Sequence, residues 1–168
     1  MRSVSSNTII VLLIGSFVVV VILFLALLPA ISHAETHREP ITKEDQNAKA
    51  WELVMVAKVI AAESCDQGGT GMAAVANVIA NRAKAWHKTP YQIVTAKNQF
   101  FGYTNKNRDL IYKGCKETAE YLAQNLMSLP DITHGALYFR QPIERIQKWH
   151  GEETVRIREH IFHLERKS

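Results

Sequence analysis

Glu63 is the residue of this sequence whose type and position best suit catalysis. It ends the apolar segment Ile60-Ala61-Ala62-Glu63, and a glycine-rich stretch begins five residues later at Gly68. A carboxyl at the C-terminus of a helix meets the negative end of the helix dipole, and apolar neighbours withhold water from it; both effects raise its pKa. A carboxyl of raised pKa is the general acid that cleavage of a glycosidic bond requires. The alternative is a solvated glutamate on the last helical turn.

The two cysteines, Cys65 and Cys115, are poor candidates for a nucleophile. A reactive thiol needs a histidine nearby, and no histidine lies within twenty residues of Cys65. In an oxidising compartment the two thiols can instead form a disulfide, which typically contributes about 2–4 kcal/mol to stability. Two unpaired, half-buried thiols are the alternative.

The sequence carries no signature of a metal or a nucleotide. Neither a His-Glu-x-x-His nor a Cys-x-x-Cys pattern is present, and these spacings are typical of zinc sites. The stretch Gly68-Gly69-Thr70-Gly71 lacks the Lys-Ser/Thr pair that completes a phosphate-binding loop. We therefore expect no metal and no cofactor.

The helix that positions Glu63 is expected to begin at Thr42. Thr42-Lys43-Glu44-Asp45 has the form of a capping box, in which a threonine and a carboxylate three residues later satisfy the first free N–H groups of a helix. By its last turns this helix is apolar on nearly every side, which predicts a central, buried position.

The remaining elements follow from changes in hydrophobic period and from turn residues. In chain order they are a helix capped by Thr70 and running to Trp86, a short helix from Thr89 to Ala96, a polar loop over residues 97–107, one helix over residues 109–128, and strands over residues 136–140 and 155–162. Together they predict an α+β domain, mostly helical, with a small β element near the C-terminus.

An uncharged apolar run precedes this domain. Residues Ile9–Leu28 are twenty residues without a charge, Arg2 precedes them, and Ser32 and Ala34 stand at the −3 and −1 positions of a cleavage site. This pattern predicts an export signal peptide over residues 1–34. The run is longer than an ordinary signal core and could cross a bilayer, so an uncleaved signal anchor is the alternative.

Both interpretations place the domain outside the cytoplasm, in the periplasm or the cell wall, and an uncleaved segment would anchor it in the inner membrane. Residues 35–41 are polar and contain a proline, so we expect them to link the segment to a single domain over residues 42–168. The formal net charge of +4 is too small to indicate a nucleic-acid partner. We expect the domain to be a monomer.

Several short motifs of this domain occur in the order found in one known family. They are Ala62-Glu63-Ser64, Gly71-Met72-Ala73-Ala74-Val75-Ala76-Asn77-Val78-Ile79-Ala80-Asn81-Arg82, Asn98-Gln99-Phe100, Asp131-Ile132-Thr133-His134-Gly135-Ala136-Leu137-Tyr138-Phe139, Trp149 and His160-Ile161-Phe162. The series resembles the cell wall hydrolase family typified by the spore cortex-lytic enzymes SleB and CwlJ, from about Ala57 to Phe162. Two positions depart from the family pattern: Phe139 replaces a second tyrosine, and Glu159 replaces the glycine before the final histidine.

The resemblance implies a lysozyme-like fold and cleavage of peptidoglycan between N-acetylmuramic acid and N-acetylglucosamine. It puts Glu63 at the position of the family's catalytic acid. Peptidoglycan is then the expected partner, and its glycan strand is expected to contact six motif positions: Gln99, Phe100, Thr133, Tyr138, Trp149 and His160.

Glu63 has no obvious second carboxylate as a partner, because Asp66 is its neighbour only in sequence and Asp131 and Glu144 are remote along the chain. A glycoside hydrolase normally uses two carboxyl groups, whereas a lytic transglycosylase needs one. This favours a lytic transglycosylase in which Glu63 acts first as acid and then as base. A hydrolytic muramidase or glucosaminidase, and a non-catalytic membrane-tethered wall-binding protein, are the alternatives.

Overall fold

Glu63 lies on helix α2, Lys43–Ser64. The structure is a computed structural model that describes residues 42–167. Its N-terminus is closed by the expected capping box: the Thr42 hydroxyl accepts from the Asp45 N–H at 3.1 Å, and the Asp45 carboxylate accepts from the Thr42 N–H at 3.2 Å. The second half of the helix is buried through Val56, Val59 and Ile60. The prediction of a central helix ending near Glu63 is therefore confirmed.

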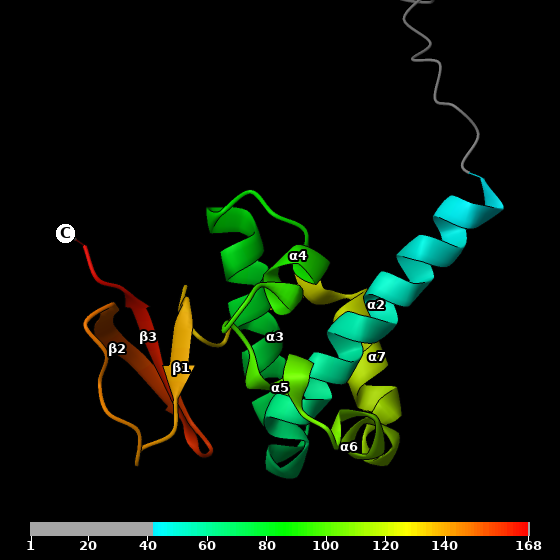
Figure 1. Ribbon diagram of the computed structural model, residues 1–168. Coiled ribbons are helices and arrows are strands. Elements are labelled where there is room, and N and C mark those ends of the chain that lie inside the picture. The colour runs from blue at the N-terminus through cyan, green and yellow to red at the C-terminus, as the bar shows by residue number, and fades with distance from the viewer. Residues whose placement is uncertain (1–41, 168) are drawn as a thin grey trace, which may run out of the picture. The chain divides into compact units, whose positions relative to one another are not determined.

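The other helices surround the buried half of α2 (Figure 1). They are α3, Gly68–Ala85; α4, Pro90–Thr95; α5, Phe101–Thr104; α6, Arg108–Gly114; and α7, Lys116–Gln124. Two short 3-10 helices, η1 at Cys65–Gln67 and η2 at Leu126–Ser128, join or extend them. None of the helices within residues 42–167 combines the length and apolarity needed to cross a bilayer. The apolar run, the cleavage site and the linker over residues 1–41 lie outside the described residues.

The glycines after Glu63 begin helix α3 instead of separating two helices, so the prediction that Thr70 caps it is wrong. Gly68 takes a φ of +70°, which turns the chain from η1 into α3 at low cost only without a side chain. A Cβ at Gly71 would lie 2.5 Å from the Cβ of Gln67, so a glycine is needed for Gln67 to pack beneath the helix.

The helix expected over residues 109–128 is broken at Cys115. There the chain leaves helical geometry with φ −137° and ψ 28°, and α6 ends and α7 begins on either side. The spacing of apolar residues continues unchanged through Cys115, so the hydrophobic pattern does not reveal the break. The one local signal is Gly114, which has a low helix propensity. The loop expected over residues 97–107 also contains a helical turn, α5, which lies against α2.

A three-stranded antiparallel sheet follows the helices, with the strand order β1-β3-β2 (Figure 1). The strands are β1, Tyr138–Arg140; β2, His150–Ile157; and β3, His160–Glu165. The single strand expected over residues 155–162 is therefore wrong: Ile157 pairs with His160, and the chain reverses at Arg158 and Glu159. Arg158 has a φ of +54°, and a turn without glycine or asparagine is not recognisable from sequence.

Helix α3 joins the sheet to the helical body. Its residues Met72, Val75 and Ile79 pack into the core around α2, while Ala74 and Val78 pack against Phe162 of β3. The segment that leads into β1 is held by side chains of α3, since the Asn77 side-chain oxygen accepts from the Ile132 N–H at 2.9 Å. The fold thus brings the end of α2, helix α3, α5 and β1 together around one site.

Candidate active site

Glu63 lies on the last turn of α2, partly withdrawn from solvent. Its Oε1 accepts a hydrogen bond from the backbone N–H of Gly102 in α5 at 2.5 Å. Burial raises the pKa of the Glu63 carboxyl above its ordinary value, and the charge of Glu144 acts in the same direction. The Gly102 N–H and the charge of Arg82 oppose that rise without cancelling it. A carboxyl held in this way keeps its proton to a higher pH than an exposed glutamate, as a general acid must.

Gly102 makes this contact with Glu63 because it has no side chain. A Cβ at this position would lie 3.0 Å from the Ala62 Cβ, 3.0 Å from Glu63 Oε1 and 3.1 Å from the Val59 carbonyl oxygen. The backbone of α5 can therefore approach α2 closely enough for its N–H to reach the carboxyl.

Arg82 of α3 is the second charged group of the site, and it is only 4% exposed. Its Nε donates to the Leu137 carbonyl at 2.5 Å, and its Nη1 donates to Gln99 Oε1 at 3.3 Å. Burial lowers the pKa of Arg82 to about 10, so the guanidinium stays a cation at neutral pH. The guanidinium carbon lies between 5.0 and 5.3 Å from the ring centres of three aromatic residues, Trp86, Phe100 and Tyr138.

Arg82 ends one of the family motifs, but it was not predicted to be a site residue. A signal was present: Arg82 stands three residues after Ile79 on the same buried face of α3, where a charged side chain is not expected. Charged residues on a core-facing stripe are rarely buried unless a partner or a function holds them there. That criterion would have selected Arg82.

A groove of about 830 Å³ opens beside Arg82. Its lining includes Arg82, Gln99, Tyr138, Arg140, Glu144 and Trp149. Glu63 is not among the lining residues, but the charges of two of them, Arg82 and Glu144, act on its carboxyl. An open groove lined by aromatic rings, amides and charges is suited to an extended polar ligand such as a glycan.

Three of the six residues expected to contact the glycan line this groove: Gln99, Tyr138 and Trp149. Gln99 is held by Arg82, while the Tyr138 hydroxyl donates to Glu165 at 3.1 Å. Trp149 is 46% exposed, which leaves much of its ring free for a ligand.

The other three expected contacts, Phe100, Thr133 and His160, are buried and do not line this groove. Phe100 packs between Arg82 and Phe139. His160 packs its ring edge-on against Phe139, with ring centres 4.7 Å apart. Their side chains pack within the fold around the site, and their contact with a glycan stays a prediction.

Thr133 belongs to a turn built around Asp131. The Asp131 carboxylate accepts from the Thr133 N–H at 2.9 Å, from the Thr133 hydroxyl at 2.7 Å and from the Gly135 N–H at 2.7 Å. Burial acts to raise the pKa of Asp131, but these hydrogen bonds, with one from Asn81, lower it below its ordinary value. Asp131 thus serves the turn that leads into β1 and is no candidate for the acid.

The remaining carboxylates differ in their access to the groove. Asp66 is exposed and does not line the groove. Glu144 does line it, although it is 81 residues from Glu63 in sequence, and its Oε2 accepts from the Gln141 N–H at 2.9 Å. Within residues 42–167 no three His, Cys, Asp or Glu side chains are grouped closely enough to hold a metal ion.

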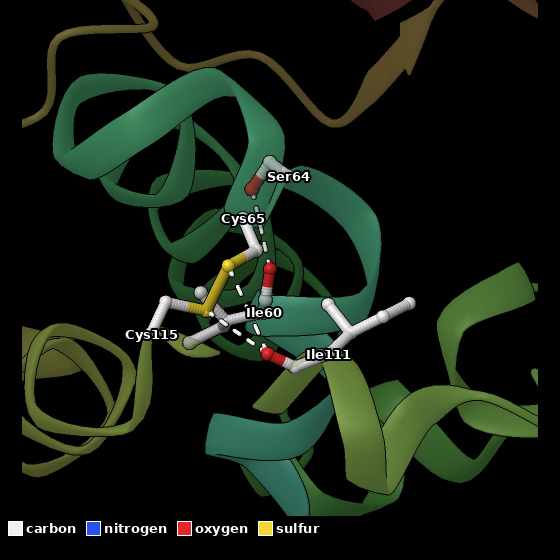
Figure 2. Close-up of a disulfide and its surroundings, with 5 residues drawn as sticks. All are labelled: Ile60, Ser64, Cys65, Ile111 and Cys115. Carbon is white, nitrogen blue, oxygen red and sulfur yellow. Dashed lines mark hydrogen bonds between the residues drawn. A yellow bond between two sulfur atoms is a disulfide. The ribbon is translucent and has the colours of Figure 1, made fainter. Parts of the chain in front are cut away.

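A disulfide joins Cys65 to Cys115, with their Cα atoms 6.1 Å apart (Figure 2). Cys65 follows Glu63 by two residues, and Cys115 is the break between α6 and α7. Beside the disulfide, the Ser64 hydroxyl donates back to the Ile60 carbonyl at 3.2 Å. The bond therefore ties the end of α2, where Glu63 lies, to the α6–α7 junction.

A family model described as cell wall hydrolase matches residues 66–163. The chain belongs to the cell wall hydrolase family. The match covers α3, the groove residues and the sheet, while Glu63 lies three residues before it. No match is found among curated proteins.

Two solved structures resemble this chain in fold. One is the catalytic domain of the Bacillus cereus SleB protein, with 26% identity and a TM-score of 0.56, covering 67% of this chain and 88% of that chain. The other is the catalytic domain of the germination-specific lytic transglycosylase SleB from Bacillus anthracis, with 27% identity and a TM-score of 0.54, covering 67% of this chain and 93% of that chain. The mostly helical fold with a small three-stranded sheet is thus shared with SleB catalytic domains.

Proposed function

We propose that this cell wall hydrolase cleaves the glycan strand of peptidoglycan as a lytic transglycosylase, with Glu63 as its catalytic residue. The observation that carries the proposal is the environment of Glu63: a partly buried carboxyl of raised pKa, oriented by the Gly102 N–H and acted on by two charged residues of an aromatic-lined groove. The likeness to a SleB domain named as a germination-specific lytic transglycosylase supports it. The same proposal has the glycan strand lying across the groove, as in a lysozyme-like enzyme.

In the first step, protonated Glu63 gives its proton to the oxygen of the glycosidic bond as the bond from that oxygen to C1 of N-acetylmuramic acid breaks. In the second step, the Glu63 carboxylate takes the proton of the C6 hydroxyl of the same sugar, and the C6 oxygen bonds to C1. The proton returns to Glu63, and the product is a 1,6-anhydro sugar. The Gly102 N–H and the charge of Arg82 stabilise the carboxylate between the two steps.

Hydrolysis is the second candidate, and Glu144 is the residue that favours it. A hydrolase needs a second carboxylate to activate water or to stabilise the sugar cation, and Glu144 lines the groove within electrostatic range of Glu63. Under the transglycosylase proposal, Glu144→Gln keeps most of the activity, because no step uses Glu144. Under hydrolysis, the same variant loses about 10²-fold or more.

Mass spectrometry of the released fragments separates the two reactions. Purified peptidoglycan digested with the enzyme should give anhydro ends, which are lighter by one water than the reducing ends of hydrolysis. Only reducing ends would replace the transglycosylase proposal by the hydrolytic one.

We also propose that the enzyme works outside the cytoplasm, in the periplasm or cell wall. The uncharged run Ile9–Leu28 supports export, and a Cys65–Cys115 disulfide fits an oxidising compartment. Cell fractionation, with sequencing of the N-terminus of the exported protein, distinguishes cleavage after Ala34 from a retained anchor.

A further inference from the structure

Arg82 is a buried cation whose charge acts on Glu63 but forms no ion pair with it. Among residues 42–167, Arg82 takes part in no salt bridge. Its two hydrogen bonds go to uncharged oxygens, those of Leu137 and Gln99. Removing a charge from water without pairing it costs free energy. A ligand group that accepts hydrogen bonds from the guanidinium would offset this cost.

The guanidinium also keeps donors that no protein group among the described residues uses. Nε and Nη1 each have one acceptor, while Nη2 has none within the described part of the chain. Nη2 is not fully buried, since it has no partner there and yet is absent from the fully buried polar atoms that lack one. Arg82 also lines the groove. Free N–H groups therefore remain on Nη1 and Nη2 of a residue that lines the groove, and a guanidinium can bind a carboxylate through two parallel hydrogen bonds.

The charge of the groove favours an anion over a neutral group. Arg82, Arg140 and Arg145 line it, against the single carboxylate of Glu144. The aromatic rings around Arg82 hold its guanidinium in place. Little side-chain entropy is therefore lost when a ligand binds.

We propose that Arg82 binds the free lactyl carboxylate of N-acetylmuramic acid, so that the enzyme prefers glycan strands from which the peptides have been removed. This inference rests on the proposed function and adds the substrate class of the same groove. A peptide attached to the lactyl group converts that carboxylate to a neutral amide. The preferred strands would thus be supplied by a hydrolase that cleaves the amide between the lactyl group and the peptide.

Calorimetric titration of the full-length Glu63→Gln variant tests the preference without turnover. The two ligands are a peptide-free tetrasaccharide of alternating N-acetylglucosamine and N-acetylmuramic acid, and the same tetrasaccharide with its carboxyls converted to methylamides. We expect the free acid to bind about 10- to 100-fold more tightly, the range for a hydrogen bond to a charged group. Equal binding of both would overturn this inference alone, whereas binding of neither would overturn the proposed function with it.

Adding Arg82→Gln to that variant assigns the preference to its residue. We expect the two ligands then to bind equally, at about the affinity of the methylamide. Lys84→Gln is the matched control, because it removes the same charge from an exposed position of the same helix, outside the groove. A preference that survives Arg82→Gln, or that is lost with Lys84→Gln, would overturn the role of Arg82. If Arg82→Gln does not fold, the comparison of the two ligands on Glu63→Gln still decides the preference.

Discussion

The backbone N–H of Gly102 donates to the carboxyl of Glu63 across 39 residues of sequence. The bond joins a turn of α5 to the last turn of α2, and its donor belongs to the main chain. A backbone donor cannot change its rotamer, so it holds Glu63 Oε1 in one place whether the carboxyl is protonated or ionised. Orientation of the acid thus depends on how closely α5 approaches α2.

Gly102→Ala should therefore reduce activity more than stability. The added Cβ would lie 3.0 Å from Glu63 Oε1 and 3.0 Å from the Ala62 Cβ, which forces α5 away from the carboxyl. A displacement of about 1 Å can lower a rate by about 100-fold. Gly114→Ala is the matched control, since a Cβ there meets no atom within 4 Å. Equal rates for the two variants on purified peptidoglycan would refute the positioning role of Gly102.

Glu63→Gln should stabilise the protein at neutral pH. The folded pKa of Glu63 is above its ordinary value of 4.5, so its contribution to stability is fully present below pH 4.5 and is lost as pH rises through the folded pKa. Glutamine keeps the oxygen that accepts from Gly102 and avoids that loss. A gain of about 1 kcal/mol would raise Tm by about 2–8 °C. Scanning calorimetry at several pH values checks this: the gain must shrink toward pH 4, and a gain of constant size would contradict it.

The Cys65–Cys115 bond should contribute substantially to stability. It closes a loop with a sequence separation of 50 residues. By lowering the entropy of the unfolded chain, a loop of this length raises the free energy of unfolding by about 4 kcal/mol. Urea unfolding with and without reductant measures the difference. A Cys65→Ala, Cys115→Ala double variant should match the reduced protein and be insensitive to reductant. No change on reduction would contradict the contribution.

Acid should destabilise the sheet side of the domain through its buried histidines. Burial lowers the pKa of His150, and the neighbouring His163, whose ring is stacked 4.8 Å away, lowers it further, as does Arg140; Glu144 acts in the opposite direction. Burial also lowers the pKa of His160. Since these folded values lie below the ordinary 6.5, only the unfolded chain takes up these protons as pH falls through 6.5, and stability is lost.

The measurement is Tm between about pH 7 and pH 5 in the Glu63→Gln background, which removes the opposing titration of Glu63. We expect Tm to fall with acidification, and His150→Gln to make the fall shallower. His87→Asn is the control, because His87 is exposed and asparagine tolerates its φ of +52°. An equal effect of the two substitutions on the slope would contradict the account.

Local sequence signals predicted the elements that position Glu63. The capping box at Thr42 is formed as expected, and the short helix expected from Thr89 also begins with one, because a capping box is satisfied within four residues. The apolar faces of α2 and α3 also follow from spacing alone. These features need no information about distant parts of the chain.

The features that prediction missed depend on contacts between distant residues. The break at Cys115 coincides with its bond to Cys65; the bond was one of the two expectations for the cysteines, but no local pattern shows that the helix breaks there. Thr133 and His160 lie in motifs of the family, yet whether a motif residue faces the groove or the core depends on how β1 and β3 pack on α3. For the same reason Glu144, remote in sequence, was not expected to act on the carboxyl of Glu63.

The central claim is that Glu63 is the acid that cleaves the glycan, and the most direct measurement is the rate at which the full-length Glu63→Gln variant clears a suspension of purified peptidoglycan. Glutamine preserves shape and hydrogen bonding but cannot give up a proton, and general acid catalysis contributes about 10²–10⁴-fold. The account predicts clearing below detection, with the variant folded and still sedimenting with peptidoglycan. A folded Glu63→Gln protein that clears peptidoglycan at close to the unmodified rate would contradict it and would make Glu144 the carboxylate to examine.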